Sequence, residues 1–273
     1  MTRRLRLDAE LVRRGLARSR EQAADLVAQG RVTVGGAVAR KPATGVDTGA
    51  AVVVRAAETD DPDYVSRGAV KLAGALTAFG GPVVSGRRCL DAGASTGGFT
   101  DVLVRRGAQQ VVAVDVGYGQ LAWRLRQDPR VVVVDRTNVR ELTVDRTGGL
   151  VDLVVADLSF ISLRLVLPAL TSVCRPDGDI VCMVKPQFEV GRERLGRGGV
   201  VRDPALRAES VVAVAGAAAT LGWGTAGVTA SPLPGPAGNV EYFCWFRRDC
   251  APPRAEVVDA AVAAGPTGER LTR

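Results

Sequence analysis

The sequence predicts a doubly wound α/β sheet with helices on both faces, preceded by a small α+β domain. Three observations support this architecture. Apolar runs typical of strands alternate with helical patterns over residues 88–247, which predicts strands joined by covering helices. A glycine-rich turn directly follows the first of these runs. Residues 1–55 hold only short elements and many arginines, which sets them apart from the remainder of the chain.

The N-terminal domain is predicted over residues 1–55. Apolar residues at helical spacing predict one helix over residues 6–14, and a second helix is predicted to begin at Ser19. Short strands are predicted over residues 30–36, which end in a glycine turn, and over residues 51–54. Residues 1–41 carry ten basic and four acidic side chains, so they hold most of the net charge of +7. This concentration favours contact with a polyanion, with a solvated basic surface as the alternative.

An acidic linker is predicted over residues 56–65, because this stretch lacks an apolar period. The second domain, over residues 66–250, is predicted to begin with a helix that Ser66 caps and that ends near Phe79. Strands are then predicted over residues 88–92, 110–115, 131–135, 151–156, 179–184, 225–230 and 240–247. Helices are predicted over residues 97–107, 119–127, 161–173 and 203–221. The last two strands have no helix between them and should pair antiparallel at one edge. Residues 251–273 are predicted to be a tail without a firm core.

Composition excludes several kinds of chemistry. The chain has no histidine, which rules out histidine bases and histidine metal ligands. The five cysteines form no Cys-x-x-Cys motif, so reduced thiols, no metal site and a cytoplasmic location are expected. Residues 210–240 are uncharged, but glycines and prolines interrupt them. A buried helix and strand are therefore favoured there over a membrane span.

The glycine-rich turn is the most informative motif. It reads Asp91-Ala92-Gly93-Ala94-Ser95-Thr96-Gly97-Gly98-Phe99. Glycines let the backbone approach a ligand closely, and the following helix N-terminus favours negative charge. The spacing differs from the Gly-x-Gly-x-x-Gly of dinucleotide-binding proteins. It resembles the S-adenosylmethionine (SAM) loop of methyltransferases, with an ordinary strand-to-helix turn as the alternative.

Acidic and polar residues also end the next two strands, where ligands bind in such sheets. Asp115 could accept hydrogen bonds from the ribose hydroxyls of the cofactor, and Asp135 or Asn138 could contact the adenine edge. The two acids could instead cap helices. The predicted cofactor-binding residues are Asp91, Gly93, Ala94, Ser95, Thr96, Gly97, Gly98, Phe99, Asp115, Asp135 and Asn138.

Lysine is rare in this chain: 33 arginines accompany only Lys41, Lys71 and Lys185. Arginine cannot lose its proton in a protein whereas lysine can, so the lysines are candidates for positions that arginine cannot fill. Lys185 ends the fifth strand of the second domain and Asp157 ends the fourth, which places an acid and a lysine at adjacent strand ends. Solvated strand-end charges are the alternative.

Lys71, Asp157, Lys185 and Glu241 resemble the Lys-Asp-Lys-Glu tetrad of ribose 2′-O-methyltransferases related to FtsJ. The resemblance implies that Lys185 removes the proton of a ribose hydroxyl and that Asp157 orients Lys185. Lys71 and Glu241 would hold the ribose in line, although Glu241 could instead be an edge-strand charge. The seven predicted strands with an antiparallel end likewise resemble the Rossmann-like fold of SAM-dependent methyltransferases.

Motifs of the first domain resemble the small RNA-binding domain named after ribosomal protein S-four. They are Arg4-Leu5-Arg6-Leu7-Asp8, Arg18-Ser19-Arg20-Glu21-Gln22-Ala23 and Gly30-Arg31-Val32-Thr33-Val34-Gly35-Gly36. A small helical module that docks on protein is the alternative. The resemblance implies that RNA is bound by Arg4, Arg6, Arg18, Arg20, Arg31 and Lys41.

All these motifs together resemble the TlyA family of SAM-dependent rRNA 2′-O-methyltransferases, historically labelled haemolysins. Further shared motifs are residues 66–72, 157–162, 185–189 and 198–201. The resemblance implies methylation of cytidine ribose in large-subunit rRNA, and in longer members also in small-subunit rRNA; the extended termini favour the longer type. The expected partners are rRNA and ribosomal subunits, with no membrane and a monomer when free. The alternatives are a methyltransferase for another RNA and a membrane-active haemolysin. The linker departs from the family, because Pro62-Asp63-Tyr64-Val65 replaces a tryptophan-containing tetrapeptide.

Overall fold

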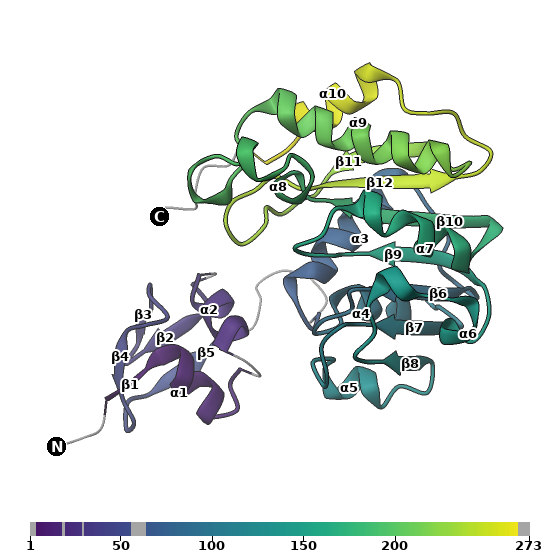
Figure 1. Cartoon of the computed structure of the whole chain (residues 1–273). Helices are drawn as coiled ribbons and strands as arrows, with labels where there is room; N and C mark the ends of the chain where they lie inside the picture. Colours follow the sequence, from purple (N-terminus) through teal and green to yellow (C-terminus); the bar gives the residue numbers. More distant parts are fainter. Residues whose placement is uncertain (1–3, 18–19, 29, 56–63, 267–273) are drawn as a thin grey trace. The chain divides into compact units, whose positions relative to one another are not determined.

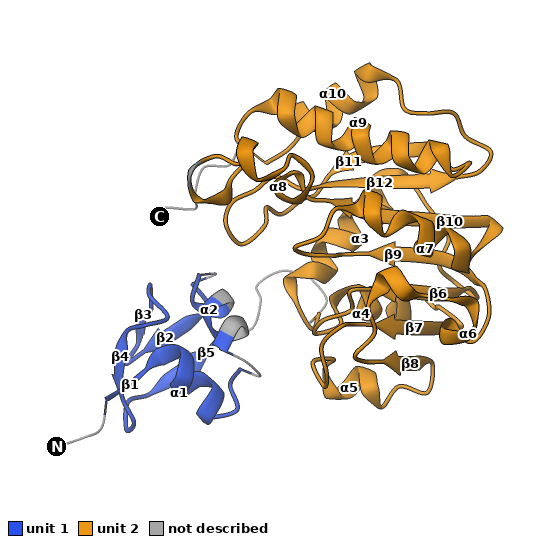
Figure 2. Cartoon of the chain, in the orientation of Figure 1, with its two compact units in different colours: residues 1–63 blue, residues 64–273 orange. Residues whose placement is uncertain are grey.

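The chain divides into two compact units, residues 1–63 and 64–273 (Figure 2). The computed structural model describes residues 4–17, 20–28, 30–55 and 64–266. The expected linker over residues 56–65 therefore lies largely outside the described residues.

Unit 1 is a small α+β fold. Helices α1 (Leu7–Arg13) and α2 (Arg20–Ala28) pack on each other. Strand β2 (Val32–Val34) pairs antiparallel with β5 (Val52–Val54) and with β3 (Ala37–Val38), and β1 (Arg4–Arg6) pairs antiparallel with β4 (Gly45–Asp47). The glycine turn predicted after β2 is present, since Gly35 and Gly36 both adopt positive φ. A core of apolar residues that include Leu7, Leu11 and Val32 holds this unit together.

Unit 2 contains one seven-stranded sheet (Figure 1). In spatial order its strands are β11 (Gly224–Ala230), β12 (Tyr242–Arg247), β10 (Cys174–Val184), β9 (Val151–Ala156), β6 (Arg88–Ala92), β7 (Gln110–Val114) and β8 (Val131–Val134). Strand β12 runs antiparallel to both its neighbours, whereas β10, β9, β6, β7 and β8 pair in parallel. The predicted sheet with an antiparallel end is confirmed.

Helices cover both faces of this sheet. On one face lie α3 (Arg67–Phe79), α4 (Gly98–Arg105) and α5 (Trp123–Arg126). On the other lie η1 (Val139–Glu141), α7 (Leu167–Val173) and α9 (Pro204–Thr220), with α6 (Val144–Thr147) against α7. Side chains of a strand alternate between the two cores: Cys89 joins the first and Leu90 the second, as do Leu153 and Val154. Both faces being buried explains why the strands are continuous apolar runs.

Two predicted helices are shorter in the structure. Only Trp123–Arg126 of the predicted 119–127 helix is helical, because Gly119 has positive φ and residues 116–119 form a bend. The predicted helix over residues 161–173 is interrupted. A short 3-10 helix, η2 (Leu163–Leu165), precedes α7, and Pro168 in the first turn of α7 favours a new helix start.

The C-terminal segment differs from the expected loose tail. Residues Ala255–Ala263 form helix α10, which packs on α9 and β11. Val258 and Ala261, three positions apart on one helix face, are buried there. Among the described residues, no helix combines the length and apolar character that a membrane crossing requires.

Candidate active site

The glycine loop lies at the carboxyl end of β6 and is packed on both sides. Gly93 (φ +89°) leaves no room for a side chain, because a Cβ atom there would overlap the carbonyl oxygen of Asp157 at the end of β9. A Cβ atom on Gly98 would overlap the Ser66 hydroxyl and the backbone of Ala69 at the start of α3. The loop thus lies between the strand end that carries Asp157 and the helix that carries Lys71.

This packing changes the role of Ser66. The residue occupies the N-cap position of α3, as predicted, but its side chain makes no capping hydrogen bond. Its hydroxyl instead lies against Gly98. The prediction that Ser66 caps this helix was therefore correct about where the helix begins. It was wrong about the capping hydrogen bond from a backbone N–H to the Ser66 hydroxyl.

Asp115 is the best placed of the predicted cofactor carboxylates. It is partly exposed at the end of β7. One of its oxygens accepts a hydrogen bond from the backbone N–H of Ser95 at 2.8 Å, and the other accepts from that of Gly117 at 2.6 Å. Asp115 thereby joins the glycine loop to the next loop. Each oxygen keeps a further lone pair that could accept a ribose hydroxyl.

Asp91 and Phe99 lie beneath the loop instead of lining it. Asp91 has no exposed surface, and one of its oxygens accepts a hydrogen bond from the Thr100 hydroxyl at 2.6 Å. Its other oxygen is buried without a partner. Burial raises the pKa of Asp91 to about 7, the Thr100 hydrogen bond opposes this, and the charge of Asp157 adds to it. Phe99 packs against Phe243 in the core, with ring centroids 6.0 Å apart.

The two predicted adenine-binding residues already have protein partners. Asp135 forms an ion pair with Arg126 at 3.1 Å. Asn138 caps η1, since its side-chain oxygen accepts a hydrogen bond from the N–H of Arg140 at 3.1 Å. Asn138 is therefore a helix cap, a role that the sequence analysis had considered only for the acids. Among the other loop residues, Ser95 is exposed and Gly93 and Thr96 are partly exposed, whereas Ala94, Gly97 and Gly98 are buried.

Lys185 directly follows β10 and is only 9% exposed. Its Nζ lies 2.6 Å from Oδ1 of Asp157 and donates a hydrogen bond to the Ser159 hydroxyl at 2.9 Å. Both partners come from the segment after the neighbouring strand β9. The pair predicted from two strand ends is therefore present.

Lys71 and Glu241 form a second buried pair. The Lys71 Nζ on α3 donates a hydrogen bond to Oε2 of Glu241 at 2.5 Å, and both residues are buried. The two residues are 170 positions apart in sequence, and Glu241 stands immediately before β12. The four predicted catalytic residues thus form two lysine–carboxylate pairs at the end of unit 2 where the glycine loop lies.

Three residues with clear roles at this end were not assigned from the sequence. Ser159 contacts Lys185. Glu189 is buried and accepts hydrogen bonds from the segment that follows β9. Asp101 in α4 accepts from the backbone N–H of Val65 at 2.9 Å and pairs with Arg124 at 2.6 Å. Ser159 and Glu189 belong to motifs noted in the sequence, but hydrogen bonds between distant segments leave no local pattern.

The predicted RNA-binding residues of unit 1 have different surroundings. Arg6 and Arg20 share the buried carboxylate of Asp8, at 2.8 and 3.1 Å. The hydrogen bond from Arg6, followed by that from Arg20, holds the pKa of Asp8 well below its usual range. Arg4 and Lys41 are exposed, and Arg31 donates a hydrogen bond to the carbonyl of Arg55 at 3.0 Å. Arg18 lies outside the described residues.

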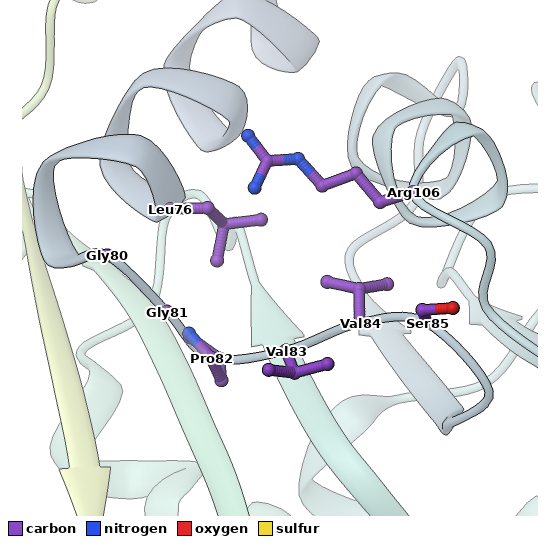
Figure 3. Close-up of a pocket in the computed structure, with 8 residues that line it drawn as sticks. All are labelled: Leu76, Gly80, Gly81, Pro82, Val83, Val84, Ser85 and Arg106. Atoms are coloured by element: carbon purple, nitrogen blue, oxygen red, sulfur yellow. The ribbon is translucent and has the colours of Figure 1, made fainter.

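A surface pocket of about 470 Å³ lies elsewhere on unit 2 (Figure 3). It is lined by Leu76, residues 80–85 and Arg106. Residues 80–85 lead into the first residue of β6, so the pocket is near the amino end of that strand. It contains none of the predicted site residues, which gather at the carboxyl end.

Comparison with known proteins assigns a family to each unit. Residues 64–248 match the FtsJ-like methyltransferase family, and residues 5–52 match the S4 domain. The chain is 66% identical over 248 residues to the 16S/23S rRNA (cytidine-2′-O)-methyltransferase TlyA of Mycobacterium tuberculosis, which covers 90% of this chain and 91% of that protein.

Two further relatives carry a different name. Hemolysin A of Brachyspira hyodysenteriae is 35% identical over 244 residues, which cover 89% of this chain and 99% of that protein. A solved structure from Streptococcus thermophilus, provisionally named a hemolysin, is 38% identical with a TM-score of 0.76 and covers 96% of each chain.

Proposed function

This chain belongs to the TlyA group of FtsJ-like methyltransferases, and we propose that Lys185, Asp157, Lys71 and Glu241 carry out its reaction. The reaction is the SAM-dependent methylation of the 2′-hydroxyl of cytidine in ribosomal RNA. The observation that carries the proposal is the contact of Lys185 with Asp157 and Ser159 beside the glycine loop.

The residues of the loop fit SAM. Gly93 and Gly97 have positive φ, and a Cβ atom on either would overlap neighbouring protein atoms, so the tight turn at the end of β6 depends on glycine. Asp115 is partly exposed at the adjoining strand end, where a ribose diol would lie. When bound, SAM supplies an electrophilic methyl group on a sulfonium cation. Asp91 supports this loop from below through Thr100.

Lys185 acts as the general base in this proposal. A ribose hydroxyl is a weak acid, so its proton must leave as the oxygen attacks. The neutral amine of Lys185 accepts that proton, and Asp157 then stabilises the ammonium that forms. Lys71 and Glu241 orient the ribose through their donor and acceptor groups.

Unit 1 supplies RNA affinity in this proposal. The exposed arginines and lysine on it provide positive charge for phosphates, and an S4 domain matches the same residues. Arg6 and Arg20 are oriented by Asp8, so they would meet phosphate as a pre-positioned pair.

The test is methyl transfer from SAM labelled in its methyl group to separated small and large ribosomal subunits, with transfer RNA as a third substrate. A 2′-O-methyl group blocks alkaline cleavage of the adjacent phosphodiester bond, because the 2′-oxygen is the nucleophile of that cleavage. We expect the label in alkali-resistant dinucleotides that contain cytidine. Label in the mononucleotides that alkali releases would mean that a base is methylated instead of the ribose. Label in transfer RNA alone would reject ribosomal RNA as the substrate.

A further inference from the structure

The amine of Lys185 is held by two groups from one short segment. Asp157 and Ser159 both follow β9, and both lie within 3 Å of the Lys185 Nζ, at 2.6 and 2.9 Å. The position of this segment therefore decides whether Asp157 and Ser159 can contact the amine of Lys185. Residues 157–162 contain no helix or strand of their own.

The conformation of this segment is not explained by its own residues. Phe160 has φ +64°, in the left-handed region that aromatic residues rarely adopt, and its side chain is 91% exposed. Neither local hydrogen bonding nor burial of Phe160 accounts for that conformation. Contacts with another part of the chain must maintain it.

Glu189 supplies hydrogen bonds at the end of this segment. This residue is 6% exposed and ends the one-turn helix α8 (Pro186–Glu189). Its Oε2 accepts a hydrogen bond from the Ser162 hydroxyl at 2.6 Å, and its Oε1 accepts from the backbone N–H of Leu163 at 2.7 Å. Arg164 adds an ion pair at 3.4 Å.

Helix α8 therefore holds the segment at both ends. Lys185 immediately precedes the helix and contacts Asp157 and Ser159, whereas Glu189 at its other end contacts Ser162 and Leu163. Between them the ring of Phe188 packs on that of Phe160, with centroids 5.2 Å apart. Hydrogen bonds from the backbone N–H groups of Phe188 and Val190 to the carbonyls of Lys185 and Pro186 close the single turn of this helix.

We propose that Glu189 is a positioning residue for the methyl transfer, which fixes residues 157–163 so that Ser159 and Asp157 orient Lys185. This inference rests on the proposed role of Lys185 as the base. Glu189 itself does not touch the substrate in this scheme; it acts through the segment that carries Asp157 and Ser159.

The test compares Glu189→Gln with wild type in the methyl-transfer assay on the full chain. Glutamine has the same size but carries an NH2 group in place of one oxygen, so it cannot accept from Ser162 and Leu163 at the two positions that Oε2 and Oε1 occupy. We expect kcat to fall at least tenfold, with the KM for RNA and the Kd for SAM within twofold of wild type. Glu256→Gln, which changes an exposed carboxylate in the first turn of α10, is the matched control and should keep the wild-type rate.

A double-mutant cycle with Ser159→Ala separates positioning from general structural support. If Glu189 acts through Ser159, the double variant loses no more kcat than the more severe single variant. The proposal would be overturned if the fold-losses in kcat of the two single variants multiplied in the double variant. A fall in SAM affinity as large as the fall in kcat would overturn it as well.

Ser162→Ala keeps the test decisive if Glu189→Gln fails to fold. It removes only one hydroxyl of the same contact, and we expect a loss of kcat of severalfold. A wild-type rate in Ser162→Ala, or in a folded Glu189→Gln, would reject the inference. Absence of transfer by the wild type would instead reject the proposed function.

Discussion

Acidic side chains have different basic partners in unit 1 and among the four candidate catalytic residues of unit 2. In unit 1, Glu10 accepts hydrogen bonds from Arg13 and Arg14 at 2.6–2.7 Å. In unit 2, Glu241 and Asp157 face lysines. Arginine stays protonated in proteins, whereas lysine can release its proton. The first kind of pair holds a fold together, and the second can also take part in proton transfer.

The protonation of two fully buried acids shows the same contrast. Hydrogen bonds from Arg13 and then Arg14 lower the pKa of Glu10 to about 2. Burial raises the pKa of Asp91 to about 7, and the hydrogen bond from the Thr100 hydroxyl only partly opposes this rise. Glu10, which is paired with two arginines, is fixed in its charged form, while Asp91 beneath the glycine loop is left close to its point of titration.

The largest effect on methyl transfer is expected from replacing the Lys185–Asp157 pair by an arginine–carboxylate pair of the kind found in unit 1. Lys185→Arg keeps the positive charge beside Asp157 but removes the ability to accept a proton. We expect kcat for methyl transfer to fall by about 10³-fold, the scale of a lost general base. The Kd for SAM should remain near that of wild type, and raising the pH should not restore the rate. Full activity would reject Lys185 as the base.

A smaller effect is expected from breaking the second lysine pair. Glu241→Gln leaves the ammonium of Lys71, whose side chain is only 10% exposed, without its counter-charge. We expect the free energy of unfolding of unit 2 to fall by about 3 kcal/mol. Tryptophan fluorescence during urea unfolding reports this unit, because Trp123, Trp223 and Trp245 all lie in it.

The control for this change is the double variant Lys71→Met with Glu241→Gln. It removes both charges, so most of the lost stability should return while methyl transfer stays impaired. If the double variant were as unstable as Glu241→Gln, the pair would be needed for packing and not for its charges.

The smallest effect concerns pH. The folded form of unit 2 holds the Asp91 proton up to about pH 7, while the unfolded chain releases it near the ordinary value of 3.8. Asp91 therefore favours the folded state most at low pH, and that contribution falls by about 2 kcal/mol from pH 5 to pH 7. Asp91→Asn should remove this decline in urea unfolding followed by tryptophan fluorescence. An unchanged slope would mean that Asp91 is ionised in the fold.

Unit 1 should respond to pH in the opposite direction. The pKa of Glu10 is lowered, so its contribution to stability is complete above about pH 4.5 and is lost as the pH falls towards 2. Hydrogen exchange of residues in α1, followed by mass spectrometry of the full chain, measures this change. The measured exchange rates are corrected for the intrinsic rate at each pH. If exchange in α1 then does not increase as the pH falls below 4.5, the two units do not respond to pH in opposite directions.

Much of the sheet was predictable from local patterns. The predicted strands 88–92 and 151–156 have the observed bounds, since a strand buried on both faces is an apolar run that ends at a charged residue or glycine. Strand β10 is longer than predicted because it continues back to Cys174 through an irregularity in its pairing with β9. Helix α10 was missed because its few buried residues gave only a weak periodic signal.

The sequence by itself determined the order of the strands and helices along the chain and the position of the glycine loop, because periodicity and turn residues are local properties. The four candidate catalytic residues were predicted from two rare lysines, acids near strand ends and a resemblance to FtsJ-related enzymes. Only the tertiary structure decided how these residues are paired. Lys71 meets Glu241 across 170 positions, and Glu189 meets Ser162 between two strand ends. It also decided that Asp91 faces the core. Such contacts depend on how α3, α8 and the strand ends pack, and no local pattern specifies that packing.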